Sequence, residues 1–177
     1  ESFQVAYHYL PELDGLKEKV KGLDTSSSVI AALAESRTYD ASYFVEQGDQ
    51  LVQQKKLNEA IRFYQAAYLL NPQSSKNLVK LGEITEKTAN SHADFKRVMN
   101  LYQRAIEKNP SDAEGYIKLG LLETEQYNLD RALVLLRQAE NLSPDDAAVF
   151  VALGKHFYKK RDYNESLNYF LKAAKIN

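Results

Sequence analysis

The chain has 177 residues, 44% of them hydrophobic, and its 23 basic side chains nearly balance 24 acidic ones to give a net charge of −1. Such a balance provides no overall field that would attract nucleic acid or acidic lipid. The absence of cysteine excludes thiol catalysis, disulfides and thiolate metal sites, but it leaves the localisation undetermined. No apolar run reaches the roughly 18 residues of a membrane span, so we expect no insertion into a membrane.

Residues 1–40 are the least regular part of the sequence. Phe3 and Ala6, followed by a proline, have the spacing with which later helices end, and they predict the tail of a helix from an upstream repeat. The segments 12–23 and 26–37 predict a shortened, degenerate helical hairpin in which a serine run caps the second helix. Because the chain starts without an initiator methionine or a leader, we expect a fragment of a longer protein.

Beyond residue 40, two residue types share one period. Glycines recur at intervals of 34, 38 and 34 residues, and prolines recur at intervals of 38 and 34. These residues are Gly48, Gly82, Gly120 and Gly154, and Pro72, Pro110 and Pro144. The period predicts four repeats, each a pair of helices, and the first three end at a proline, which cannot continue a helix. The predicted repeats are 41–74, 75–112, 113–146 and 147–177.

Within each predicted second helix, three positions fall four and three residues apart, which is the spacing of one helical face. They hold Ala60, Tyr64 and Ala67, then Val98, Tyr102 and Ala105, then Ala132, Leu136 and Ala139, then Ser166, Phe170 and Ala173. Glycine and alanine let paired helices approach to about 8 Å, and the large residue fills the adjacent gap. A mid-helix glycine costs about 0.8–1 kcal/mol relative to alanine, so its recurrence indicates a packing requirement.

The second repeat contains four extra residues between Thr88 and Asp94. Asp94 and Phe95 resume the register, so the insertion predicts either a longer loop or an additional helical turn without disturbance of the stacking. It is a candidate for a special contact with a partner. The alternative is a tolerated surface insertion.

These repeats resemble the tetratricopeptide repeat (TPR) family, in which a Leu-Gly pair, two alanines, an aromatic residue and a closing proline recur in a unit of about 34 residues. The resemblance covers residues 41–177. It implies an all-α fold, a right-handed α–α superhelix in which antiparallel helical hairpins stack as a solenoid. It also implies a protein or peptide partner and no cofactor.

The resemblance further implies that the first helix of each repeat lines a concave groove. The groove positions hold the candidate partner-binding residues, which are Val45, Asp49, Val79, Glu83, Ile117, Lys118, Leu121, Val151, Lys155, Tyr158 and Lys159. One β-branched residue per repeat would form an aliphatic row for an apolar peptide, and the alternative is packing against neighbouring helices. Lys155 and Lys159 beside Tyr158 fit an acidic segment or a terminal carboxylate, with a solvated face as the alternative.

The sequence offers little for catalysis. His8, His92 and His156 lie far apart without the spacing of metal ligands, and there is no nucleophile elbow or phosphate-binding glycine loop. We therefore expect no enzyme activity, no catalytic residue and no metal site. Tyr64 and Tyr102 fall at core positions, so we expect core packing rather than stacking on nucleic acid.

Two functions remain open. In the first, the groove captures a linear segment of a partner protein. In the second, the array is an architectural or scaffold subunit that docks through its ends, its convex face or residues 88–94. The last repeat has no capping helix over Phe170, Ala173 and Ile176, so the chain either continues or associates end to end with another copy.

Overall fold

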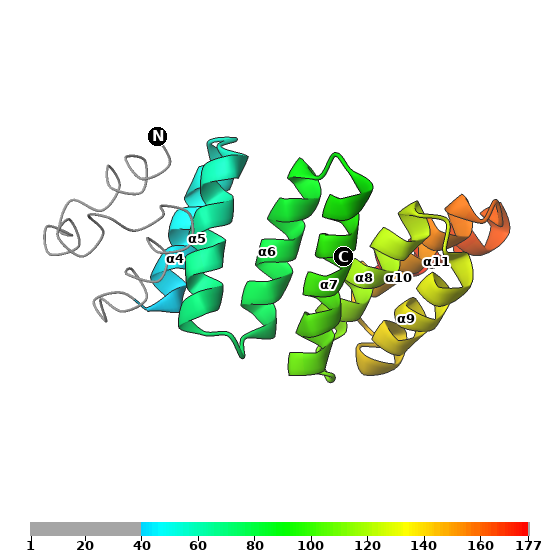
Figure 1. Cartoon of the computed structure of the whole chain (residues 1–177). Helices are drawn as coiled ribbons and strands as arrows, with labels where there is room; N and C mark the ends of the chain where they lie inside the picture. Colours follow the sequence, from blue (N-terminus) through cyan, green and yellow to red (C-terminus); the bar gives the residue numbers. More distant parts are fainter. Residues whose placement is uncertain (1–39, 177) are drawn as a thin grey trace, which may run out of the picture. The chain divides into compact units, whose positions relative to one another are not determined.

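The computed structural model describes residues 40–176, and this part of the chain contains eight α-helices and no strand (Figure 1). The helices are α4 (Ala41–Gln53), α5 (Leu57–Leu70), α6 (Ser75–Thr88), α7 (His92–Lys108), α8 (Ala113–Glu125), α9 (Leu129–Leu142), α10 (Ala147–Lys159) and α11 (Tyr163–Ile176). The predicted all-α class is confirmed, while the hairpin expected within residues 1–39 lies outside the described residues. The chain divides between Asn90 and Ser91 into two compact units.

The first unit contains α4, α5 and α6. α4 and α5 pack side by side as a hairpin, and α6 packs against α5. Asp40 and Ser74 cap α4 and α6, since each side chain accepts a hydrogen bond from the backbone N–H three residues later. The buried Asn77 side chain donates to the Ala67 carbonyl at 3.0 Å, which ties the end of α5 to α6.

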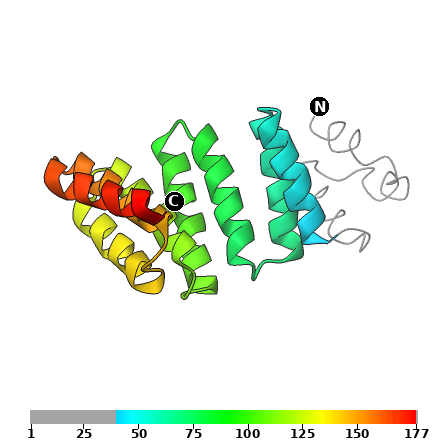
Figure 2. The ribbon, with the colours of Figure 1, turned by 180° about the vertical axis from the view of Figure 1, so that it is seen from behind.

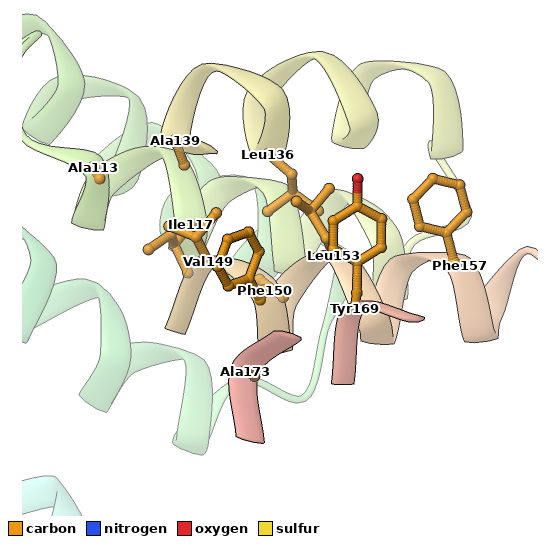
Figure 3. Packing of buried hydrophobic residues seen from close by; sticks show 11 residues of the cluster. Ala113, Ile117, Leu136, Ala139, Val149, Phe150, Leu153, Phe157, Tyr169 and Ala173 are labelled. Carbon is orange, nitrogen blue, oxygen red and sulfur yellow. The ribbon is translucent and has the colours of Figure 1, made fainter. Parts of the chain in front are cut away.

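The second unit contains α7 to α11, with α11 drawn in red in Figure 2. α8 and α9 form one hairpin and α10 and α11 the next, while α7 packs against α8, and α10 packs against both α8 and α9. Gly115 allows the close approach of α7 and α8, because a Cβ there would lie 3.0 Å from Ile106 Cγ1. Figure 3 shows the core of this unit, whose buried members include Ile117, Leu136, Val149, Leu153 and Tyr169.

Three of the four periodic glycines, Gly48, Gly120 and Gly154, face large side chains of the partner helix. The nearest atom to a Cβ would be Tyr64 Cε1 at 2.8 Å for Gly48, Leu136 Cδ2 at 2.7 Å for Gly120, and Phe170 Cδ1 at 2.7 Å for Gly154. The large residue therefore lies directly over the glycine, not merely beside it. This contact is the packing requirement that the recurrence of glycine indicated.

The turns inside three repeats share one backbone conformation. Lys55, Tyr127 and Arg161 have φ values of 62°, 61° and 67°, in the left-handed region that costs a residue with a Cβ about 1–2 kcal/mol. In each turn the next N–H donates to the carbonyl five residues earlier at 2.9 Å, which completes a Schellman motif. The three helix pairs are thus closed by the same tight turn.

The second repeat joins its helices differently. α6 ends at Thr88, Ala89 is extended with φ −65° and ψ 129°, and α7 begins at His92. Ser91 and Asp94 form a capping box at the start of α7. α7 has 17 residues whereas α5, α9 and α11 have 14 each. Of the two structures expected for the insertion, the additional helical turn is the one that forms.

Candidate partner-binding surface

The candidate residues of the first unit lie on α4 and α6. Val45 is half-buried, and Val79 is buried with 1% of its surface exposed. Asp49 is engaged by its own chain, because Tyr64 Oη donates to Oδ1 at 2.5 Å and Lys80 Nζ lies 3.0 Å from the same atom. Val79 therefore offers a partner almost no surface, in agreement with the packing alternative left open by the sequence.

These contacts set the charge states of Asp49 and Tyr64. Burial alone would raise the pKa of Asp49, but the hydrogen bonds from Tyr64 and Lys80 outweigh it and hold that pKa below its usual value. Burial, followed by the hydrogen bond to Asp49, raises the pKa of Tyr64 well above its usual range. Asp49 is therefore a carboxylate held in an intramolecular ion pair, and Tyr64 is a neutral donor.

The candidate residues of the second unit lie on α8 and α10. Ile117 is buried, with 7% of its surface exposed. Leu121 and Val151 are half-buried and pack against the core, so part of each apolar side chain remains at the surface. Lys155 and Tyr158 are exposed, the latter by 63%. We call this group the α8–α10 surface, which consists of Lys118, Leu121, Val151, Lys155 and Tyr158.

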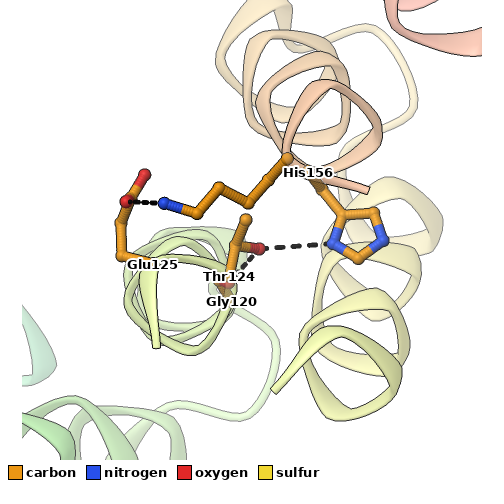
Figure 4. Close-up of polar contacts among 5 residues, drawn as sticks. Gly120, Thr124, Glu125 and His156 are labelled. Carbon is orange, nitrogen blue, oxygen red and sulfur yellow. Dashed lines mark hydrogen bonds and ion pairs between the residues drawn. The ribbon is translucent and has the colours of Figure 1, made fainter. Parts of the chain in front are cut away.

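Two contacts fix the register of α8 against α10 (Figure 4). Lys159 Nζ lies 2.8 Å from Glu125 Oε2, and His156 Nδ1 lies 3.3 Å from Thr124 Oγ1. Lys159 also lies over the ring of Tyr127, 4.5 Å from its centroid. The hydrogen bond to Glu125 raises the pKa of Lys159. Lys159, a candidate partner-binding residue, is thus already paired with a carboxylate of its own chain.

Lys155 lies beside an apolar residue of its own helix. Val151, which is half-buried, precedes it by one turn on the same face of α10. Among the described residues Lys155 forms no ion pair, whereas Lys159 one turn later is paired with Glu125. A positive charge therefore stands at the edge of an apolar strip.

His156 is a buried polar residue to which the sequence assigned no role. It is 1% exposed. Thr124 Oγ1 donates to the Gly120 carbonyl at 2.9 Å and so accepts from Nδ1–H of the imidazole. Burial, and then the charges of Lys160 and Arg137, lower the pKa of His156. The ring is therefore neutral at pH 7, and its Nε2 has no hydrogen-bond partner among the described residues.

Glu123 is a second buried polar residue, and it secures the turn between α8 and α9. Its fully buried carboxylate accepts a hydrogen bond from Asn128 Nδ2 at 2.7 Å and lies 3.1 Å from Arg131 Nε. The contact with Arg131 is an ion pair without a well-directed hydrogen bond, since Oε1 accepts none. The signal that could have identified Glu123 is its place next to the buried Leu122 on the inward face of α8.

The structure brings together only part of the predicted set. The α8–α10 surface lies within the second unit, whereas Val45, Asp49, Val79 and Glu83 belong to the first unit. A continuous groove along all four repeats stays a prediction. Across residues 40–176, no helix is long and apolar enough to cross a membrane, and no three His, Asp or Glu side chains are grouped so that they could hold a metal ion.

Comparison with known proteins places these helix pairs in context. No protein-family model matches the chain. In sequence, it is 29% identical over 114 residues to anaphase-promoting complex subunit 3 of Schizosaccharomyces pombe. The matched segment covers 64% of this chain and 16% of that protein. In structure, it matches TTC0263, a TPR protein of Thermus thermophilus, with a TM-score of 0.71 and 18% identity over 84% of this chain and 79% of that one.

Two further solved structures share the architecture. MamA matches with a TM-score of 0.63 and 21% identity over 92% of this chain and 94% of that one. YrrB, described as a TPR protein with an unusual peptide-binding site, matches with a TM-score of 0.60 and 20% identity over 100% of this chain and 93% of that one. The described helices have the fold of a TPR array.

The array explains the periodic glycines, alanines and prolines as the residues that pack one TPR hairpin. Proteins with the TPR fold are typically non-catalytic modules that bind other proteins or peptides. The chain spans only about a sixth of the length of its yeast relative. The likeness therefore concerns the repeats and not the activity of the whole relative.

Proposed function

We propose that this TPR array is a non-catalytic protein-interaction module that holds a segment of a partner protein on the α8–α10 surface. The observation that carries the proposal is the apolar strip of Leu121 and Val151 beside the unopposed charge of Lys155. A strip of this kind suits a segment that combines an apolar side chain with a nearby carboxylate, because the first is removed from water and the second meets an ammonium group.

The first unit supports this choice of surface by contrast. Its equivalent position to Leu121 is Asp49, which is engaged by Tyr64 and Lys80. A partner carboxylate would have to displace Asp49 before it could use Lys80. The exchange would replace one ion pair between half-exposed groups with another, so the gain in binding free energy is small.

Partners of other classes fit the surface less well. The balance of charge over the whole chain gives nucleic acid no field to follow. The α8–α10 surface offers apolar contact and two lysines, Lys118 and Lys155, rather than a row of cations. We therefore propose a protein or peptide partner, and neither a nucleic acid nor a substrate to be transformed.

A second function is favoured by a specific observation, namely the likeness to a protein named as a subunit of the anaphase-promoting complex. In this alternative the array is a scaffold subunit that joins a larger assembly through its ends, its convex face or the lengthened α7. Such docking would leave the α8–α10 surface without a role in binding.

The experiment is selection of a random peptide library against the purified protein. We expect enriched peptides that pair an apolar residue with an acidic one, and we expect Lys155→Glu to weaken them by about tenfold or more, because a like charge then faces the carboxylate. The matched control is Lys96→Glu on α7, an exposed position with the same change of charge. Enrichment of peptides that bind Lys155→Glu and the unchanged protein equally well would contradict the proposal.

A further inference from the structure

A buried imidazole lies between the two helices that carry the α8–α10 surface (Figure 4). His156 follows Lys155 directly in α10, and its hydrogen-bond partner Thr124 lies three residues after Leu121 in α8. The imidazole is 1% exposed, and the ring of Phe157 lies edge-on to it with the centroids 5.2 Å apart. The described residues themselves therefore provide its surroundings.

The hydrogen bonds leave one place on the ring for a further proton. Thr124 Oγ1 donates to the Gly120 carbonyl, so it accepts from Nδ1–H of the imidazole, and that nitrogen is already protonated. A second proton must bind Nε2, which is buried and has no hydrogen-bond partner among the described residues. The charged ring would then hold a buried donor without an acceptor, which costs folding free energy.

The charges around the ring increase this cost. α10 itself contributes Lys160, and α9 contributes Arg137 and Asp130; within residues 40–176, neither α8 nor α11 adds a charge that acts on the ring. Lys160 and Arg137 repel an imidazolium ion, whereas Asp130 attracts it and has the smallest effect of the three. Arg137 is held in place, because it donates to Glu140 and to the hydroxyl of Tyr169.

The contact between α8 and α10 is the one that can relieve this cost. α10 shares a hairpin with α11, in which Ser166 Oγ donates to the Gly154 carbonyl at 2.9 Å. Towards α8, the polar contacts are that of His156 and the ion pair of Lys159 with Glu125, which is 61% exposed and so adds little. In stacked repeats the interface between neighbours contributes separately from each hairpin. Separation of α10 from α8 would let water reach Nε2 while both hairpins stay intact.

We infer that proton uptake by His156 separates α8 from α10 and so releases a partner segment from the α8–α10 surface in mild acid. Leu121 lies on one of these helices, and Val151 and Lys155 lie on the other. A segment that contacts both helices is held only while they stay together. The effect on binding rests on the proposed function, whereas the separation of the helices does not.

Binding is measured with a selected peptide that pairs an apolar residue with an acidic one, by fluorescence anisotropy at pH 7.5 and pH 5. The peptide carboxylate stays ionised at pH 5, because its pKa is about 4. One proton can weaken binding by at most about tenfold per pH unit, and we expect a loss of about tenfold or more over this range. His156→Asn keeps a donor for Thr124 but cannot become charged, so it should bind equally well at both pH values.

Two charge variants should change this loss in opposite directions. Lys160→Gln removes a repelling charge, so the charged ring is tolerated better and the loss of affinity in acid should shrink. Asp130→Asn removes the attracting charge, so the loss should grow. Both positions are exposed, so neither change disturbs the core, and the pair keeps the test decisive if His156→Asn fails to fold.

Separation of the helices is measured without any peptide. The chain has no cysteine, so spin labels can be attached to Gln138→Cys on α9 and Asn168→Cys on α11, which are both exposed positions. Pulsed electron paramagnetic resonance then reports the distance between the two hairpins. We expect one distance at pH 7.5 and an additional, longer one at pH 5, and we expect His156→Asn to keep the single distance.

Three outcomes would overturn the inference. The unchanged protein could bind the peptide equally well at both pH values, the distance between the labels could stay the same, or Lys160→Gln and Asp130→Asn could change the loss of affinity in the same direction. If no peptide is selected at pH 7.5, the proposed function fails instead, and the distance between the labels decides the inference by itself.

Discussion

In two places the first helix of one repeat contacts the first helix of the next repeat, and the two can be compared directly. These pairs are α4 with α6 and α8 with α10. At equivalent positions the first pair carries Asp49 and Lys80, which form an ion pair 3.0 Å apart, and the second pair carries Leu121 and Ala152. On α4 and α6 the two charges form an ion pair with each other, whereas α8 and α10 present an apolar strip next to Lys155. The framework residues fix how the helices stack, while the surface positions decide what each pair can bind.

The largest expected effect concerns the framework that both pairs share. Gly48→Ala should destabilise the protein by about 1–2 kcal/mol, because the gain in helix propensity is smaller than the cost of moving a well-packed ring. The ring is that of Tyr64, which is 3% exposed and held by Asp49. Urea unfolding followed by circular dichroism measures the change.

Gly154→Ala is the matched control for this prediction. The residue over Gly154 is Phe170, which is 37% exposed and can swing outwards. The substitution should therefore be neutral or slightly stabilising. If Gly48→Ala and Gly154→Ala had the same effect, the large residue over the glycine would not be what requires glycine there.

The next largest effect concerns the hydrogen bond from Tyr64 to the Asp49–Lys80 ion pair. Tyr64→Phe should cost about 1 kcal/mol at pH 7, since it removes a hydrogen bond to a carboxylate that is partly screened by water. Because the pKa of Asp49 is lowered in the folded protein, its contribution is present above the unfolded value of about 3.9 and is lost as pH falls through the folded value. The difference between Tyr64→Phe and the unchanged protein should therefore shrink in acid, and a constant difference from pH 7 to pH 3 would contradict this account.

The pair of helices α8 and α10 should make the stability of the protein depend on pH over a different range. The pKa of His156 is lowered by burial and by Lys160 and Arg137, against a smaller opposing effect of Asp130. The unfolded chain then binds the proton more readily, so stability is full above about pH 6.5 and declines as pH falls towards the folded value. His156→Asn keeps a donor for Thr124 and should remove this decline. Thermal melts of both proteins between pH 7.5 and pH 5 would reveal it, and parallel curves would argue against a neutral buried imidazole.

The smallest effect concerns the turns. Arg161 has a φ of 67°, so Arg161→Gly should stabilise the protein by about 0.5 kcal/mol, as relief of the left-handed strain exceeds the extra entropy of glycine. Ala89→Gly is the comparison, because Ala89 has a φ of −65° and gains no such relief. Ala89→Gly should therefore destabilise the protein, and destabilisation by both changes in urea unfolding would contradict a left-handed strain at Arg161.

Much of the fold follows from the sequence because packing requires particular residues at a fixed period. Gly48, Gly120 and Gly154 each lie under a large side chain, so their spacing reveals the helix pairs. The insertion was harder to predict, since its length allows either a loop or a helix. Ser91 and Asp94 decided between them through a capping box, which a reading of the short S-x-x-D pattern could have found.

The surface was less predictable because exposure depends on neighbouring helices. Val79 and Ile117 occupy groove positions of the family but are buried, whereas Val151 at the same position is half-buried. Asp49 and Lys80 are 31 residues apart, and their contact depends on how one repeat is rotated against the next. The period alone does not supply that rotation, so it could not show which charges are paired and which, like that of Lys155, are not.

The most direct test of the central claim is to map where a selected peptide binds. A peptide from the library is added to isotope-labelled protein, and the amide shifts of α8 and α10 are compared with those of α4 and α6. We predict changes around Leu121, Val151 and Lys155 and none around Asp49 and Lys80. Changes confined to α4 and α6 would contradict the account, because the surface that satisfies its own charges would then be the one that binds.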